Sequence, residues 1–328
     1  MDFQPNIQTS EKPYVIGLDM GGTNSVFGIV DQRGNIISQT VISTRAYPDV
    51  NDYVAAAVEA LQPCLEVAGG IDNIKGMGIG APNGNFYTGC IEYAANLLWD
   101  GVVPIGKLFE DALGIPCRVT NDANAAALGE MTYGVARGMK NFVMITLGTG
   151  VGSGIVVDGK VVYGCDGFAG ELGHAIVDRS PEARQCGCSR KGCLETYCSA
   201  TGVARTARLM LEKSDAPSPL RNIAPDQITS FDVFQAAEAG DPIAIEIFNY
   251  TGEKLGHACA NFALFSAPEA FVFFGGLTKA GHWIMDPIAK AYDEEILGIY
   301  KGKAKLLVST LKGSEAAVLG ASALGWEE

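Results

Sequence analysis

Residues 14–24 read YVIGLDMGGTN, and this stretch decides the fold class. Its first seven residues are mostly apolar, as expected of a strand, and Gly-Gly-Thr-Asn is a turn signal. Residues 25–30 (SVFGIV) and 36–43 (IISQTVIS) read as two further strands, so the opening predicts a β-meander. Apolar residues at 54, 58, 61 and 65 then mark one face of a helix that can cover the sheet.

The opening pattern returns about 128 residues later, where NFVMITL at 141–147 runs into GTGVGSG. In both copies a strand ends in a Gly/Thr turn, a second strand returns through Gly-Ile-Val, and an Asp/Gly turn leads to a third strand, here VVYG. The alternation of strands, turns and helices indicates an α/β protein, and the repeat indicates a duplicated lobe. Two unrelated β-hairpins that share Gly and Val are the alternative.

Length and composition set the class of protein. A chain of 328 residues with 48% hydrophobic and 19% charged residues suits two globular lobes with a cleft. The net charge of −13 argues against nucleic acid and anionic membranes as partners. Residues 1–13 read as a flexible tail without signal-peptide character. The sequence contains no apolar run long enough to predict a membrane span. We therefore expect a soluble cytoplasmic protein whose nine cysteines are reduced thiols or metal ligands.

The two glycine-rich turns are candidate phosphate sites. Asp19 ends an apolar strand, where it can act through a hydrated magnesium ion, and the turn after it offers backbone N–H groups and the Thr23 hydroxyl to an anion. Residues 147–154 (LGTGVGSG) repeat this chemistry. A single glycine-rich turn is more often a plain hairpin. A pair of such turns at equivalent places in a repeat instead favours a site in which both hold one polyphosphate. No P-loop or Rossmann fingerprint occurs in the chain.

Asp122 lies in NDAN at 121–124, between a short strand at 117–120 and a helix expected over 123–133. Capping of that helix is the ordinary role for an aspartate at this place. If two phosphate turns face a cleft, however, phosphoryl transfer to a hydroxyl needs a carboxylate that accepts its proton. Asp122 is the candidate for this base.

A cysteine-rich segment predicts a metal site. Residues 186–193 (CGCSRKGC) carry thiols at Cys186, Cys188 and Cys193, and His174 lies twelve residues before the first. Three Cys and one His complete a tetrahedral shell that zinc favours, and four protein ligands make it a structural site. Buried free cysteines are the alternative.

Further polar residues surround these motifs. Glu171 and Glu195 flank the cysteine segment and are either solvated carboxylates or acceptors for a polyhydroxylated substrate, to which Asn96 adds a donor and an acceptor. Gly275 and Gly276 interrupt an apolar strand at 270–274, where they either admit an adenine ring or simply end the strand.

DMGGTN, NDANAAALGE, LGTGVGSG, GELGH and CGCSRKGCLE occur in this order, and with them the chain resembles the ROK family of sugar kinases and repressors, most closely its bacterial glucokinase-like members. The resemblance implies a two-lobed actin/hexokinase-like ATPase fold, made of duplicated ribonuclease H-like domains around a central cleft. The small lobe is expected at 14–121 plus about 314–328, and the large lobe at 122–313 with a zinc-binding loop at 174–195. Asn24 departs from the lysine that is frequent at its place.

The resemblance also implies roles for single residues. Asp122 is the catalytic base, and ATP with Mg²⁺ is expected at Asp19, Gly21, Gly22, Thr23, Gly148, Thr149 and Gly150. The residues themselves add Asn24, Gly275 and Gly276 to the expected nucleotide site. The sugar is expected at Asn96, Asn121, Asp122, Glu171, His174 and Glu195, and structural Zn²⁺ at His174, Cys186, Cys188 and Cys193. His174 would serve both sites.

These features predict ATP-dependent phosphorylation of a hexose, foremost glucose to glucose 6-phosphate, in carbohydrate metabolism and glycolysis. N-acetylglucosamine or another hexose is the alternative substrate. A non-catalytic sugar-sensing ROK transcriptional regulator is the alternative class, although the first family strand at Tyr14 leaves no room for a DNA-binding domain before it. A kinase-dead sugar-binding protein leaves the joint presence of Asp122 and both phosphate motifs unexplained. Relatives lead us to expect a homodimer or homotetramer.

Overall fold

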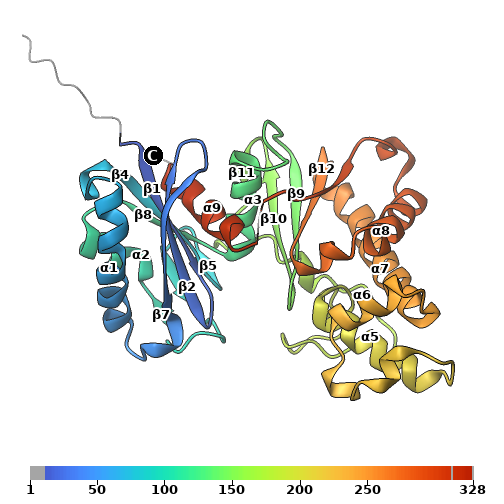
Figure 1. Ribbon diagram of the computed structural model, residues 1–328. Helices are drawn as coiled ribbons and strands as arrows, with labels where there is room; N and C mark the ends of the chain where they lie inside the picture. The colour runs from blue at the N-terminus through green and yellow to red at the C-terminus, as the bar shows by residue number, and fades with distance from the viewer. Residues whose placement is uncertain (1–11, 312, 327–328) are drawn as a thin grey trace, which may run out of the picture. The chain divides into compact units, whose positions relative to one another are not determined.

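The computed structural model describes residues 12–311 and 313–326, so most of the predicted tail lies outside the described residues. The chain divides into two compact units (Figure 1). Unit 1 takes in Met1–Gly129 and Ser314–Glu328, and unit 2 takes in Glu130–Gly313. No helix in the described ranges combines the length and the apolarity needed to cross a bilayer.

Unit 1 is built on a five-stranded sheet in the order β3-β2-β1-β4-β8. The first three strands form the predicted antiparallel meander, and β4 and β8 continue the sheet parallel to β1. Their bounds are β1 Tyr14–Met20, β2 Asn24–Asp31, β3 Ile36–Ser43, β4 Ile74–Gly80 and β8 Cys117–Thr120. A small second sheet joins β5 Gly84–Asn85, β6 Cys90–Glu92 and β7 Val102–Val103.

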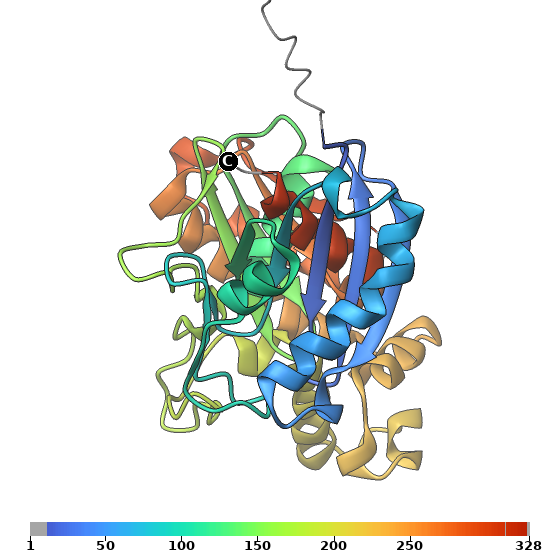
Figure 2. The same ribbon diagram turned by 90° about the vertical axis from the view of Figure 1, so that its left-hand side faces the viewer.

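One face of this sheet carries the larger apolar side chains of β1. Ile16 and Leu18 are fully buried in a core shared with α1 (Val50–Val67) and α2 (Ile105–Leu113), which form one layer (Figures 1 and 2). Asp49 caps α1, since its carboxylate accepts from the N–H of Asn51 at 2.7 Å. The helix covers the predicted apolar positions and runs several residues further at its N-terminal end.

The opposite face of the sheet is flat because glycines lie side by side on three strands. Gly17 pairs with Gly28 on β2 and with Gly78 on β4. A Cβ on Gly78 would lie 1.9 Å from the carbonyl oxygen of Ala321 on α9 (Gly313–Gly325). The C-terminal helix α9 therefore packs directly on the backbone of this glycine row, which only glycine permits.

Unit 2 repeats the same plan. Its sheet has the order β11-β10-β9-β12-β13, with the first three strands antiparallel and the last two parallel to β9. The bounds are β9 Phe142–Leu147, β10 Val151–Val157, β11 Lys160–Val161, β12 Ala270–Phe274 and β13 Lys305–Val308. The predicted third strand VVYG is reduced to Lys160–Val161, because the chain leaves the sheet before Gly164, whose φ is +76°.

The helices of unit 2 surround a large apolar core that includes Phe248, Phe271 and Phe273. They are α4 Glu195–Cys198, α5 Ala200–Lys213, α6 Ser230–Glu238, α7 Pro242–Ser266 and α8 His282–Glu295. Helices α7 and α8 approach closely, since a Cβ on Gly252 would lie 2.4 Å from the Cβ of Pro287.

The boundary between the units differs from the predicted one. Helix α3 (Asp122–Thr132) begins in unit 1, whereas the large lobe is predicted from the sequence to begin at Asp122. The first half of α3 packs against α9, and a Cβ on Gly320 would lie 2.5 Å from the carbonyl oxygen of Ala125. This packing assigns Asp122 to unit 1.

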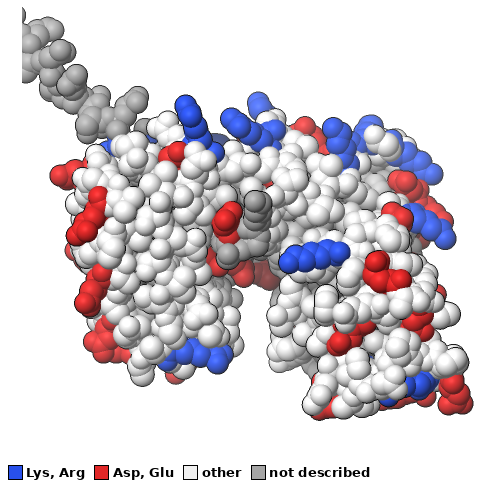
Figure 3. Space-filling view, in the orientation of Figure 1, with Lys and Arg blue, Asp and Glu red and all other residues white. Residues whose placement is uncertain are grey.

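The surface carries the acidic balance of the sequence. Acidic side chains are spread over the visible surface of unit 1 (Figure 3). Along α1, exposed acidic residues recur at seven-residue intervals, at Asp52, Glu59 and Glu66. Lys107 and Asp111 form an exposed ion pair on α2.

Candidate active site

The carboxyl ends of the parallel strands in unit 1 carry two aspartates. Asp19 lies near the end of β1, and Asp122 follows the end of β8. Parallel strands end at the same edge of a sheet, which is where α/β folds place their ligands. Burial and, to a smaller extent, the nearby Asp122 carboxylate together raise the pKa of Asp19 to about 6. Sequence alone did not reveal this pairing.

Asp122 stands at the start of α3. Its Oδ1 accepts a hydrogen bond from the N–H of Ala123 at 2.8 Å, and desolvation raises the pKa of its carboxyl. Asp122 is also exposed to solvent, so the desolvation of its carboxylate is only partial. Asn121 caps the helix, because its Oδ1 accepts from the N–H of Asn124 at 2.7 Å. The capping role considered for Asp122 is thus filled by its neighbour.

The first glycine-rich turn joins β1 to β2. The N–H of Gly21 donates to the carbonyl of Asn24 at 2.9 Å, which closes the turn. A Cβ on Gly22 would lie 2.6 Å from the carbonyl oxygen of Asn96. The exposed loop with Asn96 therefore packs directly on this turn, so a predicted sugar residue and a predicted phosphate motif adjoin within unit 1.

The second glycine-rich turn occupies the equivalent place in unit 2, between β9 and β10. The N–H of Gly148 donates to the carbonyl of Gly150 at 3.0 Å. Gly275, at the end of β12, has a φ of +115°, and a Cβ there would lie 2.4 Å from the carbonyl oxygen of Leu147. Gly275 thus lies against the strand end that leads into the turn. A Cβ on Gly276 would meet no atom within 4 Å.

The carboxylate of Glu195 reaches this second turn from α4. Its Oε2 accepts from the N–H of Val151 at 3.1 Å, and Oε1 lies 3.6 Å from Sγ of Cys186. A Cβ on Gly150 would lie 2.2 Å from Oε2, so a side chain at this position would displace the Glu195 carboxylate.

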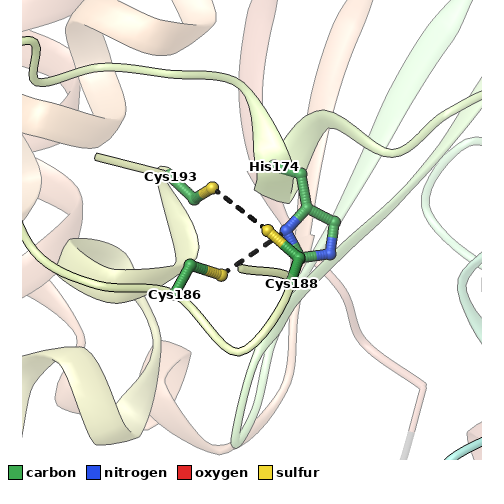
Figure 4. A group of neighbouring side chains, drawn as sticks. All are labelled: His174, Cys186, Cys188 and Cys193. Atoms are coloured by element: carbon green, nitrogen blue, oxygen red, sulfur yellow. Dashed lines mark hydrogen bonds between the residues drawn. The ribbon is translucent and has the colours of Figure 1, made fainter. Parts of the chain in front are cut away.

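The four predicted metal ligands come together in unit 2. The ligand atoms of His174, Cys186, Cys188 and Cys193 all lie within 4.8 Å of one another (Figure 4). Cys188 Sγ is 3.6 Å from Cys193 Sγ, and Cys186 Sγ is 3.7 Å from His174 Nδ1. Zinc–sulfur bonds of about 2.3 Å in a tetrahedron separate two sulfur ligands by about 3.8 Å. The cluster fits a tetrahedral ion.

The second nitrogen of His174 faces another predicted residue. Its Nε2 lies 3.9 Å from Oε2 of Glu171, and both side chains are partly open to solvent. Because Nδ1 faces the thiols, Nε2 is the nitrogen that remains for a substrate or for Glu171.

The cysteine segment is held by a residue that sequence reasoning missed. The buried guanidinium of Arg184 stacks on the ring of Tyr197 at 4.4 Å and donates to the carbonyl of Thr196 at 2.8 Å. The Tyr197 hydroxyl donates to Asp178 at 2.7 Å. These partners are backbone atoms and distant rings, which leave no signal in the local sequence.

Comparison with known proteins places the chain in a family. The family model described as "ROK family" matches residues 15–328. The chain belongs to the ROK family. Among its relatives, a glucokinase of Halalkalibacterium halodurans is 36% identical over 317 residues, covering 95% of this chain and 94% of that protein. A glucokinase of Streptomyces coelicolor is 33% identical, covering 95% of this chain and 97% of that protein.

Solved ROK structures confirm the fold. The ROK family glucokinase of Streptomyces griseus, in complex with glucose and AMPPNP, has a TM-score of 0.74 and 32% identity, covering 95% of this chain and 98% of that chain. The predicted family and the actin/hexokinase-like fold are thereby confirmed, together with the duplicated sheet order.

Proposed function

We propose that the protein is a sugar kinase that transfers the γ-phosphate of ATP to a hexose, foremost glucose, giving glucose 6-phosphate. The observation that carries this proposal is the position of Asp122, which heads α3 at the strand edge shared with Asp19 and the first glycine-rich turn. The named glucokinases among the relatives, and the solved complex of the Streptomyces griseus glucokinase with glucose and AMPPNP, support it.

Asp122 acts as the general base in this reaction. Its carboxylate accepts the proton of the 6-hydroxyl while that oxygen attacks the γ-phosphorus and the bond to the β-phosphate oxygen breaks in line. The raised pKa of the Asp122 carboxyl makes it a better proton acceptor than an ordinary surface aspartate, provided that it stays ionised.

The other predicted residues divide between the two substrates. In unit 1 the nucleotide phosphates would be held by Gly21, Gly22, Thr23 and Asn24, with Asn96 and Asn121 for the sugar. In unit 2 the nucleotide would be held by Gly148, Thr149, Gly150, Gly275 and Gly276, and the sugar by Glu171, His174 and Glu195. Asp19 would hold Mg²⁺ with ATP, where the ion would neutralise charge on the phosphates.

Zinc is the ion that suits His174, Cys186, Cys188 and Cys193. Four protein ligands fill a tetrahedral shell, so the ion would be structural and would fix the loop that carries the proposed sugar residues. His174 would hold the ion through Nδ1 and present Nε2 to the sugar.

Two other functions are outcomes of the test. Phosphorylation of N-acetylglucosamine or another hexose would require changes only in the residues that contact the sugar. A sugar-sensing regulator would bind sugar and DNA without phosphorylating the sugar, and that role would not require Asp122 and two phosphate turns.

We also propose that the protein is a cytoplasmic homodimer or homotetramer that acts in glycolysis, without nucleic-acid partners.

The deciding experiment offers a hexose panel and Mg-ATP to the wild type, to Asp122→Asn and to the exposed control Asp72→Asn. Sugar phosphate formation and sugar binding are measured separately. We expect phosphorylation of glucose, a loss of roughly 100-fold or more in kcat for Asp122→Asn, and no change for the control. Wild-type protein that binds sugar but phosphorylates none would overturn the proposal.

A further inference from the structure

Three carbonyl groups of the first glycine-rich turn are engaged from one short segment. The hydroxyl of Thr44 donates to the carbonyl of Gly21 at 2.8 Å, and its N–H donates to that of Thr23 at 2.9 Å. Between them, Nε of Arg45 donates to the carbonyl of Gly22 at 3.1 Å. Residues 44 and 45 thus hold three successive carbonyls.

A buried chain of hydroxyls supports Thr44. The Tyr53 hydroxyl donates to Ser25 Oγ at 2.8 Å, and Ser25 and Thr44 share a hydrogen bond of 2.8 Å. Because Thr44 gives its proton to Gly21, Ser25 donates to Thr44, and every donor in the chain points toward the turn. The three hydroxyl residues are at most 3% exposed, so water does not replace these bonds.

Unit 2 repeats this arrangement with other residues. The N–H of Ala200 donates to the carbonyl of Gly148 at 2.8 Å, and the Thr201 hydroxyl donates to that of Thr149 at 2.8 Å. The Gly150 carbonyl is engaged within the turn. Thr201 in turn shares a hydrogen bond of 2.9 Å with the buried hydroxyl of Ser199. Each turn therefore has a Thr–Ser hydroxyl pair behind it.

The engaged carbonyls determine where the amides point. In a trans peptide the C=O of one residue and the N–H of the next point in opposite directions. Fixing the carbonyls of Gly21, Gly22 and Thr149 therefore aims the N–H groups of Gly22, Thr23 and Gly150 away from the supporting segments. Successive N–H groups that face one side are an anion-binding arrangement.

We propose that Thr44 and Thr201 are positioning residues for the phosphates of the nucleotide, each acting through the backbone of its turn. This inference rests on the proposed function, because it takes the ligand of both turns to be ATP. Neither threonine belongs to the glycine motifs or to the sugar and metal residues named above.

The test compares Thr44→Val and Thr201→Val with Thr44→Ser and Thr201→Ser. Valine keeps the shape and removes the hydroxyl donor, and serine restores it. We expect each valine variant to raise the KM for ATP about 5- to 30-fold with less than a twofold change in the KM for sugar. We expect each serine variant to return to within about threefold of wild type. An unchanged ATP KM in the valine variants, or serine variants as impaired as the valine ones, would overturn the inference.

Two controls separate positioning from general stability. Thr229→Val removes a threonine that caps α6 and lies in neither turn, so we expect a lower melting temperature and an unchanged ATP KM. Ser25→Ala shortens the hydroxyl chain without touching the turn, and we expect a weaker effect in the direction of Thr44→Val. If Thr44→Val does not fold, Ser25→Ala and the Thr201 variants still decide the question.

Hydrogen–deuterium exchange of the nucleotide-free protein tests the support of the two turns without relying on kinase activity. Peptides that cover 19–24 and 147–152 should exchange faster in Thr44→Val and Thr201→Val, respectively, each without effect on the other turn. Unchanged exchange would overturn the positioning role even in an active kinase. If the variants exchange faster but the wild-type protein phosphorylates no sugar, the carbonyl contacts are upheld and the proposed kinase activity is rejected.

Discussion

The carboxylate of Glu195 accepts a hydrogen bond from the backbone N–H of Val151, with Oε2 and N 3.1 Å apart. Val151 directly follows the second glycine-rich turn, and the other oxygen of Glu195 contacts Cys186 of the metal cluster at 3.6 Å. One side chain thus contacts both the proposed nucleotide turn and the proposed zinc site. A residue expected to bind only sugar therefore has a second set of partners.

We expect Glu195→Ala to weaken ATP binding as well as sugar binding. The loss of a charged acceptor from the Val151 N–H should lower kcat/KM for ATP by about 10- to 100-fold. Steady-state kinetics with each substrate varied in turn measure this. Glu182→Ala, an exposed acid in the same segment, is the matched control, and an ATP response equal to that control would refute the coupling.

Asp19→Asn should stabilise the nucleotide-free protein at pH 7 to 8. The folded-state pKa of about 6 lies above the ordinary value of 3.8, so the folded state binds the extra proton. The ionised carboxylate therefore destabilises the fold above pH 6, and this penalty fades as the pH falls toward 4. We expect the melting temperature of the variant to exceed that of wild type by about 2 to 5 °C at pH 7.5.

The same comparison at pH 4.5 is its control, because Asp19 is then largely protonated in the fold and an amide replaces a neutral acid. An equal gain at both pH values would show that the carboxylate charge is not the cause. Mg-free buffer is needed, since a bound cation would offset the repulsion from Asp122.

Removal of the metal should lower stability and sugar affinity together. Chelation of the purified protein, or Cys188→Ser, should lower the melting temperature by about 10 °C or more, since such sites contribute several kcal/mol. Metal content and sugar binding by calorimetry are measured on the same samples. Cys165→Ser changes an exposed thiol outside the cluster and should leave all three quantities unchanged. Metal-free wild type that melts normally would argue against a structural ion.

Gly78→Ala should destabilise unit 1 severely. Its Cβ would lie 1.9 Å from the carbonyl oxygen of Ala321, so α9 would have to move off the sheet, at a cost of roughly 3 kcal/mol or more. Chemical denaturation measures the loss. In Gly298→Ala the new Cβ meets no atom within 4 Å, so we expect a change within about 0.5 kcal/mol. Similar losses in both variants would mean that the close approach is not the cause.

Local patterns in the sequence predicted most of the sheet framework. The strand at Cys117–Thr120 and the helix after it were expected within a residue, because the Asn-Asp pair at 121–122 marks the boundary between them. The clustering of His174, Cys186, Cys188 and Cys193 was also predicted, since spacing and ligand chemistry are properties of the sequence itself.

Contacts between distant segments could not be predicted in this way. Thr44 and Thr201 support turns that lie 20 or more residues away, and a threonine in such a place has no local signature. The unit boundary was misplaced for the same reason, because it depends on the packing of α3 against a helix almost 200 residues later. Physical proximity of Asp19 and Asp122 likewise emerges only once β1 and β8 lie in one sheet.

The glycine row under α9 has a consequence for protein synthesis. Unit 2 is one continuous stretch, so all of its strands and helices have been translated by residue 313. Unit 1 must wait, because the helix that packs on Gly17 and Gly78 comes from residues 313–325. The strands of unit 1 that are made first therefore keep the backbone of the glycine row uncovered until residues 313–325 are available, and only then can unit 1 complete its packing.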